Sequence, residues 1–208
     1  MRTVALMVAI FVAGLWCERA AAQAPDATPQ EPKKEAASAA VPRSMGVPDE
    51  ITSLRTLIGS WNVAMTYYSP IGQPFKIASE AIIEPTLSGN FLRERLVVPW
   101  GPLRIELECT RSFDRFQSVY RFVWFDDFMS LADVFEGTAT AGIITVSNVR
   151  VGTSSRLPGQ PETFLRITQK PGTTNDEYSL VWEASTDDGA TWRKTADCAY
   201  TRKPEALR

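Results

Sequence analysis

The chain contains no histidine among its 208 residues. Histidine serves Ser-His-Asp and Cys-His catalysis, the usual zinc sites and the proximal ligation of haem. It is also the one side chain whose ordinary pKa lies near neutrality. The sequence therefore excludes these catalytic arrangements, and we expect no cofactor.

Long apolar runs and concentrated charge are also scarce. The apolar run from Val4 to Trp16 is shorter than the roughly 20 residues that span a bilayer as a helix. The 22 basic and 24 acidic residues are scattered singly and give a formal net charge of −2. A nucleic-acid binder usually needs a concentrated positive footprint. We expect no nucleic-acid partner and no membrane span in the processed chain, and a protein partner stays open.

Residues 1–22 have the pattern of a secretory signal peptide. Arg2 supplies the positive start, the apolar run supplies the core, and Ala20-Ala21-Ala22 supplies the small residues that a signal peptidase reads. Cys17 offers a lipoprotein alternative, but it follows the bulky Trp16, whereas a lipid-modified cysteine normally follows a small residue. We expect cleavage near Ala22 and export to the periplasm or the extracellular space.

Residues 23–48 contain five prolines and no aromatic residue. Such a segment cannot bury enough surface to offset its chain entropy, so we expect a disordered Pro/Ala-rich linker. Apolar residues make up 44% of the chain, which is enough for one sizeable core. We place that core in a single domain over residues 49–203, followed by a short tail at 204–208.

One short helix is expected at the start of this domain. Asp49 is positioned to cap it, and Ile51, Leu54 and Ile58 recur on one face before Gly59 ends it. No other segment of the sequence predicts a helix convincingly.

From Trp61 onward, short runs of alternating apolar and polar residues predict strands. Leu103, Ile105 and Leu107 share one face of such a run, and charged residues take the other. Nine turn segments separate the runs: 69–72, 87–90, 99–102, 114–115, 126–127, 141–142, 152–161, 171–175 and 187–189. Nine connections without crossover helices predict an all-β fold, an antiparallel up-and-down β-barrel of about ten strands.

Gly59-Ser60-Trp61, which opens the first strand, resembles the Gly-x-Trp start of lipocalins and other calycin-type barrels. In those folds the tryptophan closes the base of the barrel, and a basic residue of the last strand covers it. The resemblance implies a structural role for Trp61. It also implies that Arg202 is the covering residue, through a cation–π contact.

A second resemblance, to bacterial lipocalin-like domains of unknown function, spans nearly all of residues 54–203. The segments that carry it are Leu57–Trp61, Phe113–Phe116, Tyr120–Asp126, Ser185–Trp192 and Tyr200–Lys203. It implies the fold and no assigned catalytic residues. Related ten-stranded barrels that bind haem use a histidine ligand, so the present sequence does not inherit that activity.

Five aromatic residues occupy alternating positions of two predicted strands: Tyr120, Phe122, Trp124, Tyr178 and Trp182. If these faces point inward, they line a cup for one small apolar or amphipathic ligand. The alternative is that they fill the interior as core. About ten strands leave more room than eight, which favours the cup. The facing stays open, because Val119, Val123 and Phe125 form an equally apolar opposite face.

Arg93 is the candidate anchor for a ligand head group. Arg93 shares one face of its strand with Arg95, and Glu94 lies on the opposite face. Whichever face points inward carries charge into the barrel, unless the strand lies at the rim. An inward arginine together with an inward carboxylate such as Asp133 would suit a carboxylate or phosphate group. A structural buried pair, or a bulge that turns the arginines outward, is the alternative.

The remaining chemistry-bearing residues predict little activity. Cys109 and Cys198 either form a disulfide in an oxidising compartment or are buried free thiols. The Asp126-Asp127 and Asp187-Asp188-Gly189 segments are interpreted as turns, so we predict no metal site and no catalytic residue.

The leading hypothesis is a non-enzymatic carrier or sensor in the cell envelope that holds a small molecule inside the barrel. The second is a structural or interaction module with a filled barrel. An enzyme that uses carboxylates or Tyr and Lys ranks last, because strand alternation alone does not bring two such groups together.

Overall fold

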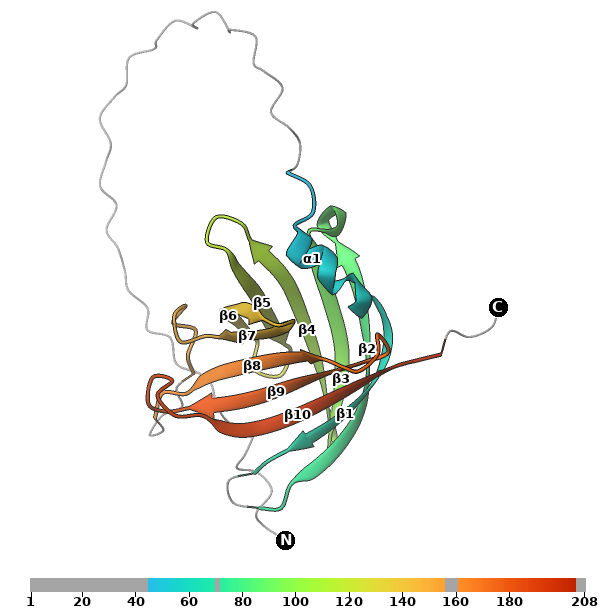
Figure 1. Cartoon of the computed structure of the whole chain (residues 1–208). Helices are drawn as coiled ribbons and strands as arrows, with labels where there is room; N and C mark the ends of the chain where they lie inside the picture. The colour runs from blue at the N-terminus through green and yellow to red at the C-terminus, as the bar shows by residue number, and fades with distance from the viewer. Residues whose placement is uncertain (1–44, 70–71, 156–160, 205–208) are drawn as a thin grey trace, which may run out of the picture.

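The computed structural model describes residues 45–69, 72–155 and 161–204. The expected signal peptide, residues 23–44 of the expected linker and residues 205–208 of the tail lie outside these ranges. The described residues form one closed antiparallel barrel with a short helix before it, which confirms the predicted fold class (Figure 1).

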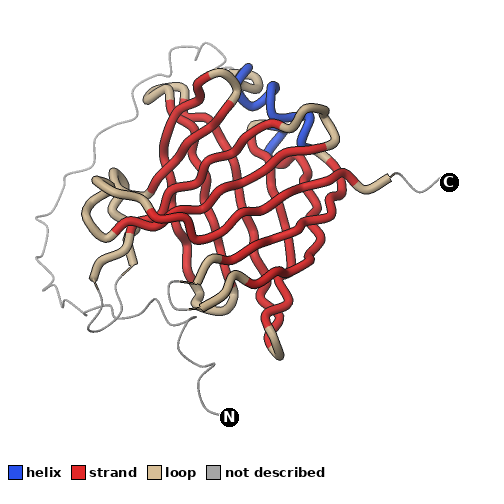
Figure 2. The backbone as a smooth tube through the Cα atoms, turned by 60° about the horizontal axis from the view of Figure 1, so that its bottom comes forward, coloured by secondary structure: helices blue, strands red, loops and turns tan. Residues whose placement is uncertain are grey.

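Two short helices precede the ten strands, and a third, η2, lies between the second and third strands. In chain order they are α1 (Asp49–Ser53), the 3-10 helix η1 (Leu54–Leu57), β1 (Gly59–Tyr67), β2 (Phe75–Thr86), the 3-10 helix η2 (Leu87–Gly89), β3 (Phe91–Trp100), β4 (Leu103–Asp114), β5 (Val119–Asp126), β6 (Leu131–Thr140), β7 (Ile143–Ser147), β8 (Phe164–Pro171), β9 (Glu177–Ser185) and β10 (Arg193–Arg202). Each strand pairs with its neighbours along the chain, and β1 closes the barrel on β10 (Figure 2). Each predicted turn segment overlaps one of the nine connections.

The start of α1 differs from the expectation. Pro48 is the N-cap residue and no side chain caps the helix, so the prediction that Asp49 caps it is wrong. Asp49 lies instead in the first turn, where a negative charge suits the helix dipole. The chain continues as η1, and the tighter 3-10 turn buries Leu57 with Leu54, while Ile58 is already extended.

The helices cover one end of the barrel, which we call the α1 end. Ile51 and Leu57 are buried there with Trp61. The guanidinium carbon of Arg202 lies 4.3 Å from the Trp61 ring centre, and the Trp61 indole N–H donates to the Leu57 carbonyl at 2.8 Å. The opposite end, where β1 and β5 finish, is called the far end.

Arg202 also holds the backbone around this tryptophan. Its guanidinium donates to the Ile58 carbonyl at 2.8 Å, to the Thr56 carbonyl and to the Asp176 carboxylate at 2.9 Å. Gly59 has φ +139°, and a Cβ at this position would lie 2.6 Å from Arg202 Nη1. Glycine is therefore required here, both by its backbone conformation and by the approach of Arg202.

Replacing Arg202 with methionine is expected to destabilise the barrel, since it removes several charged hydrogen bonds and the cation–π contact. We expect the free energy of unfolding in urea to fall by about 2–4 kcal/mol. Lys203→Met is the control, because Lys203 pairs with the exposed Glu80 on the outer wall, and it should change little. Equal effects of the two substitutions would contradict the assigned role of Arg202.

Candidate functional site

Strand alternation decides which charges enter the barrel. In β3, Leu92, Glu94 and Leu96 are buried on the inner face. Arg93 lies on the outer wall, where it pairs with Glu84 and its side chain is 37% exposed. The arginines of β3 therefore face outward, but in a regular register with β2 and β4 and not through a bulge, and Arg93 does not reach the interior.

The five predicted aromatic residues all lie on the inner face. Tyr120, Phe122, Trp124 and Tyr178 are buried, and Trp182 is half-buried against the same core. The structure thus brings together the aromatic side chains that alternation placed on two separate strands. Their role in binding a ligand stays a prediction.

The interior contains a buried ion pair that the sequence analysis missed. Glu94 and Arg111 have no exposed side-chain surface, and Arg111 Nη2 donates to Glu94 Oε2 at 2.5 Å. The Tyr200 hydroxyl donates to Glu94 Oε1 at 2.8 Å. The Arg111 guanidinium also lies 5.3 Å from the Phe122 ring centre. The Glu94–Arg111–Tyr200 network therefore places one positive and one negative charge in the core.

The surroundings keep the Tyr200 phenol and the Arg111 guanidinium protonated, so both groups remain hydrogen-bond donors. Burial, reinforced by the charge of Glu94, raises the pKa of Tyr200 well above its ordinary value, so the phenol stays a donor. Burial opposes the charge of Arg111, but the charge of Glu94 favours it, and the Arg111 pKa is raised. The guanidinium is therefore charged at any working pH.

Several buried polar atoms of the interior have no partner within the described part of the chain. They are Nε and Nη1 of Arg111, Nε1 of Trp124, Oε1 of Gln169 and the hydroxyl of Tyr178. A buried polar group without a partner costs about 1–3 kcal/mol, so native proteins rarely leave one unmatched. The interior thus offers three N–H donors, one amide oxygen and one hydroxyl group to whatever fills it.

A second pair of charges lies on the inner face at the far end. Asp133 in β6 is directly opposite Trp124 in β5, and Asp126 ends β5. Burial, with a smaller contribution from the charge of Asp126, raises the pKa of Asp133 to about 6. Asp133 does not pair with Arg93, because Arg93 faces outward.

The two cysteines of the domain are free and buried, so the disulfide alternative is not realised. Burial raises the pKa of Cys109 and of Cys198 to about 12. Both thiols are therefore protonated at neutral pH, and neither supplies a nucleophilic thiolate.

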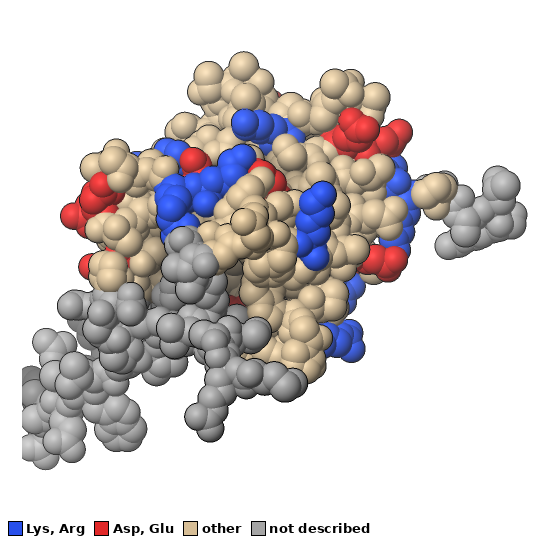
Figure 3. Space-filling view, turned by 90° about the horizontal axis from the view of Figure 1, so that it is seen from below, with Lys and Arg blue, Asp and Glu red and all other residues tan. Residues whose placement is uncertain are grey.

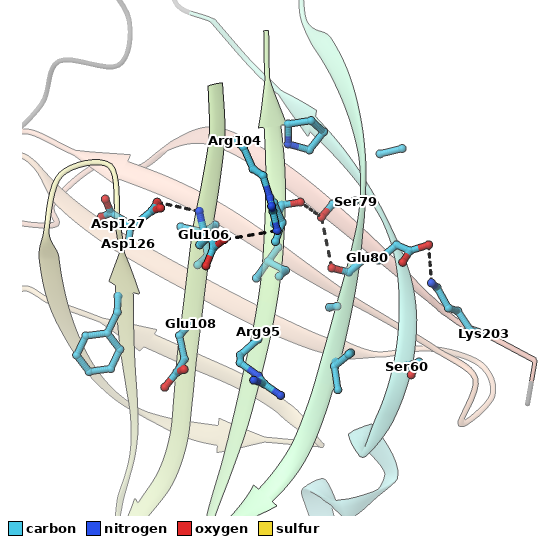
Figure 4. Close-up of a pocket in the computed structure, with 18 residues that line it drawn as sticks. Ser60, Ser79, Glu80, Arg95, Arg104, Glu106, Glu108, Asp126, Asp127 and Lys203 are labelled. Carbon is cyan, nitrogen blue, oxygen red and sulfur yellow. Dashed lines mark hydrogen bonds and ion pairs between the residues drawn. The ribbon is translucent and has the colours of Figure 1, made fainter. Parts of the chain in front are cut away.

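Two depressions lie on the outer wall rather than inside the barrel. One, of about 1020 Å³, crosses β2 to β5, and the other, of about 470 Å³, lies on β1, β2 and β10. In the first, Arg104 points toward Glu106 and Lys203 toward Glu80 (Figure 4). Basic and acidic side chains are likewise interspersed in an otherwise uncharged surface when the molecule is seen from the far end (Figure 3).

Neither a membrane helix nor a metal cluster was found within residues 45–69, 72–155 and 161–204. No helix there is long and apolar enough to cross a membrane. No three or more His, Cys, Asp or Glu side chains there gather into a group that could hold a metal ion.

The Glu94–Arg111 pair gives a stability prediction. Glu94→Gln leaves a buried guanidinium without its counter-charge, so the free energy of unfolding in urea should fall by about 3–5 kcal/mol. The double variant Glu94→Gln/Arg111→Met removes both charges at similar volume and should recover much of this loss. Equal stabilities of the single variant and the wild type would show that the pair is not buried in solution.

Comparisons with known proteins give structural matches only. No family model matches the chain, and no curated protein matches it by sequence. The solved structure of Rv2717c from M. tuberculosis superposes with a TM-score of 0.54 at 15% identity, covering 76% of this chain and 99% of that one. The S-type phycobiliprotein lyase CPES from Guillardia theta gives 0.50 at 10% identity, covering 74% and 93%. At these identities the likeness shows the fold alone, and the chain shares its barrel fold with these two proteins.

Proposed function

We propose that the protein is a non-enzymatic carrier or sensor that holds a small amphipathic molecule inside its barrel. The observation that carries this proposal is the fully buried guanidinium of Arg111, whose Nε and Nη1 have no acceptor among the described residues. An oxygen of the bound molecule would accept from these groups, and the aromatic inner face would contact its apolar body.

The charge of the network selects the kind of oxygen. Glu94 already neutralises Arg111, so a second anion at this depth would be repelled by Glu94 and would be costly to desolvate. An uncharged carbonyl, hydroxyl or ether oxygen satisfies the free N–H groups without that cost. The expected head group at Arg111 is therefore neutral, in place of the carboxylate or phosphate expected from an inward Arg93.

Export to the cell envelope supplies the context of this proposal. It rests on the signal-like pattern of residues 1–22, which only sequence supports. N-terminal sequencing of the mature protein would test it, and the expected new N-terminus is Gln23.

The second candidate function is an interaction module that uses the outer wall. Ile82 and Phe125 line the larger outer depression and are 49% and 41% exposed. Exposed apolar side chains in a hollow are typical of binding surfaces. The charged residues around them are largely paired with one another, which favours the interior as the functional site.

Binding of 1-dodecanol to the full chain tests the interior site. Its hydroxyl supplies a neutral oxygen, and quenching of the interior tryptophans reports occupancy. The double variant Glu94→Gln/Arg111→Met removes the free guanidinium donors, and we expect about tenfold weaker binding. Arg93→Met removes an arginine from the outer wall and should leave the affinity unchanged.

Unchanged affinity in the double variant would contradict the proposal, and so would an equal loss in Arg93→Met. Native mass spectrometry of the chain purified without detergent adds a direct observation. We expect an extra mass that disappears on denaturation and that is reduced in the double variant.

A further inference from the structure

The far end of the interior combines two carboxylates with two tryptophans. Asp133 and Trp124 are register partners on the inner face, and Asp126 follows Trp124 by two positions on the same face of β5. The Trp124 and Trp182 rings meet edge to face, with centroids 5.1 Å apart. These four residues are called the far-end site.

The carboxylates of this site lack a cation. Neither Asp133 nor Asp126 forms an ion pair within the ranges that the structure describes, and Asp126 accepts only the Met129 backbone N–H at 2.5 Å. The deeper charges of Glu94 and Arg111 cancel each other. Asp133 and Asp126 therefore have no direct counter-charge among the described residues, although they are partly buried.

The groups facing Asp133 from other strands do not neutralise it. Cys109, opposite Trp124 on β4, is protonated, since its pKa is about 12. Arg193 starts β10 at this end, opposite the inner-face residue Ala184, but it is exposed and forms no ion pair with either aspartate. Burial and, to a smaller extent, the charge of Asp126 raise the pKa of Asp133 to about 6.

The tryptophans supply an independent indication of a ligand. Trp124 is 8% exposed, and its indole N–H, on the inner face, has no acceptor. Indole faces attract cations, and a carboxylate beside them adds a direct counter-charge. The Trp124 N–H would donate to an oxygen atom of the ligand that lies close to its cationic group.

We infer that the far-end site binds the ammonium group of a hydrophobic amine, with Asp133 as its counter-charge and Trp124 and Trp182 against its sides. The inference rests on the proposed function, because the same molecule would place its apolar body deeper in the barrel. The ligand class is then a cationic amphiphile with a neutral oxygen, such as an amino alcohol or an amino amide.

Three probes with the same alkyl chain test this inference on the full chain at neutral pH: dodecylamine and dodecanoate below their micelle concentrations, and 1-dodecanol below its solubility limit. Tryptophan quenching gives the dissociation constants. We expect the amine to bind about tenfold more tightly than the alcohol and the carboxylate to bind most weakly. Asp133→Asn should abolish the preference for the amine and leave the affinity for the alcohol unchanged.

Asp188→Asn is the matched control. It removes one negative charge from an exposed hairpin turn, and its φ of +55° suits asparagine, so amine binding should not change. The wild type provides a second measurement that does not depend on folding of a variant. The preference for the amine should disappear as the pH falls through about 6, because Asp133 becomes protonated.

The outcomes separate the inference from the proposed function. Equal affinities for amine and alcohol, or an amine preference that persists in Asp133→Asn or at low pH, overturn the inference and leave the proposed function standing. Failure of all three probes to bind overturns both.

Discussion

Pairing of β1 with β10, from Trp61 opposite Arg202 to Tyr67 opposite Ala196, is the constraint on which the rest of the molecule depends. It leaves the sheet without an edge and gives every strand an inside and an outside. A side chain deep on the inner face, such as Glu94 or Arg111, then has no direct path to bulk water. Any charge placed there must find its partner within the barrel or in a bound molecule.

Closure explains why the inner charges are arranged as they are. Glu94 and Arg111 form an ion pair, and the Tyr200 hydroxyl donates a hydrogen bond to the second carboxylate oxygen of Glu94. The guanidinium still has more donors than Glu94 accepts from, and its Nε and Nη1 form no hydrogen bond within the described part of the chain. These unpaired N–H groups destabilise the fold when no ligand is bound, and they are available to bind an oxygen atom of a ligand.

The two ends of the barrel differ in a way that suits such a ligand. At the α1 end, Trp61 contacts Tyr178 with centroids 4.9 Å apart, and Tyr178 stacks on Tyr200 at 4.1 Å. At the far end the inner face becomes less buried and carries Asp133 and Asp126. A molecule that enters from the far end would meet these carboxylates first and Arg111 last.

Local sequence chemistry predicts most of the fold. Turn residues marked all nine connections, and Gly59-Ser60-Trp61 marked the first strand together with its partner Arg202. The sequence does not show which face of each strand points into the barrel. Alternation separates Arg93 from Glu94, but only the closed sheet shows that Glu94 points inward.

The site depends further on contacts between strands. Arg111 continues the alternation of Leu107 and Cys109, so the sequence places these three residues on one face of the strand. The partner of Arg111 is not visible in the sequence, because pairing with Glu94 requires the side-by-side arrangement of β3 and β4. The sequence placed Ile58 on the buried face of the first helix, whereas the structure buries Leu57 there, because the chain continues as a 3-10 turn. No residue of that segment indicates this turn.

A crystal structure of the protein purified from its own cells without detergent would test the central claim most directly. We predict non-protein density inside the barrel, with an oxygen atom within hydrogen-bond distance of Arg111 Nε or Nη1 and an apolar part against the aromatic side chains of the inner face. Density for isolated waters alone beside Arg111, in an interior otherwise filled by side chains, would contradict it.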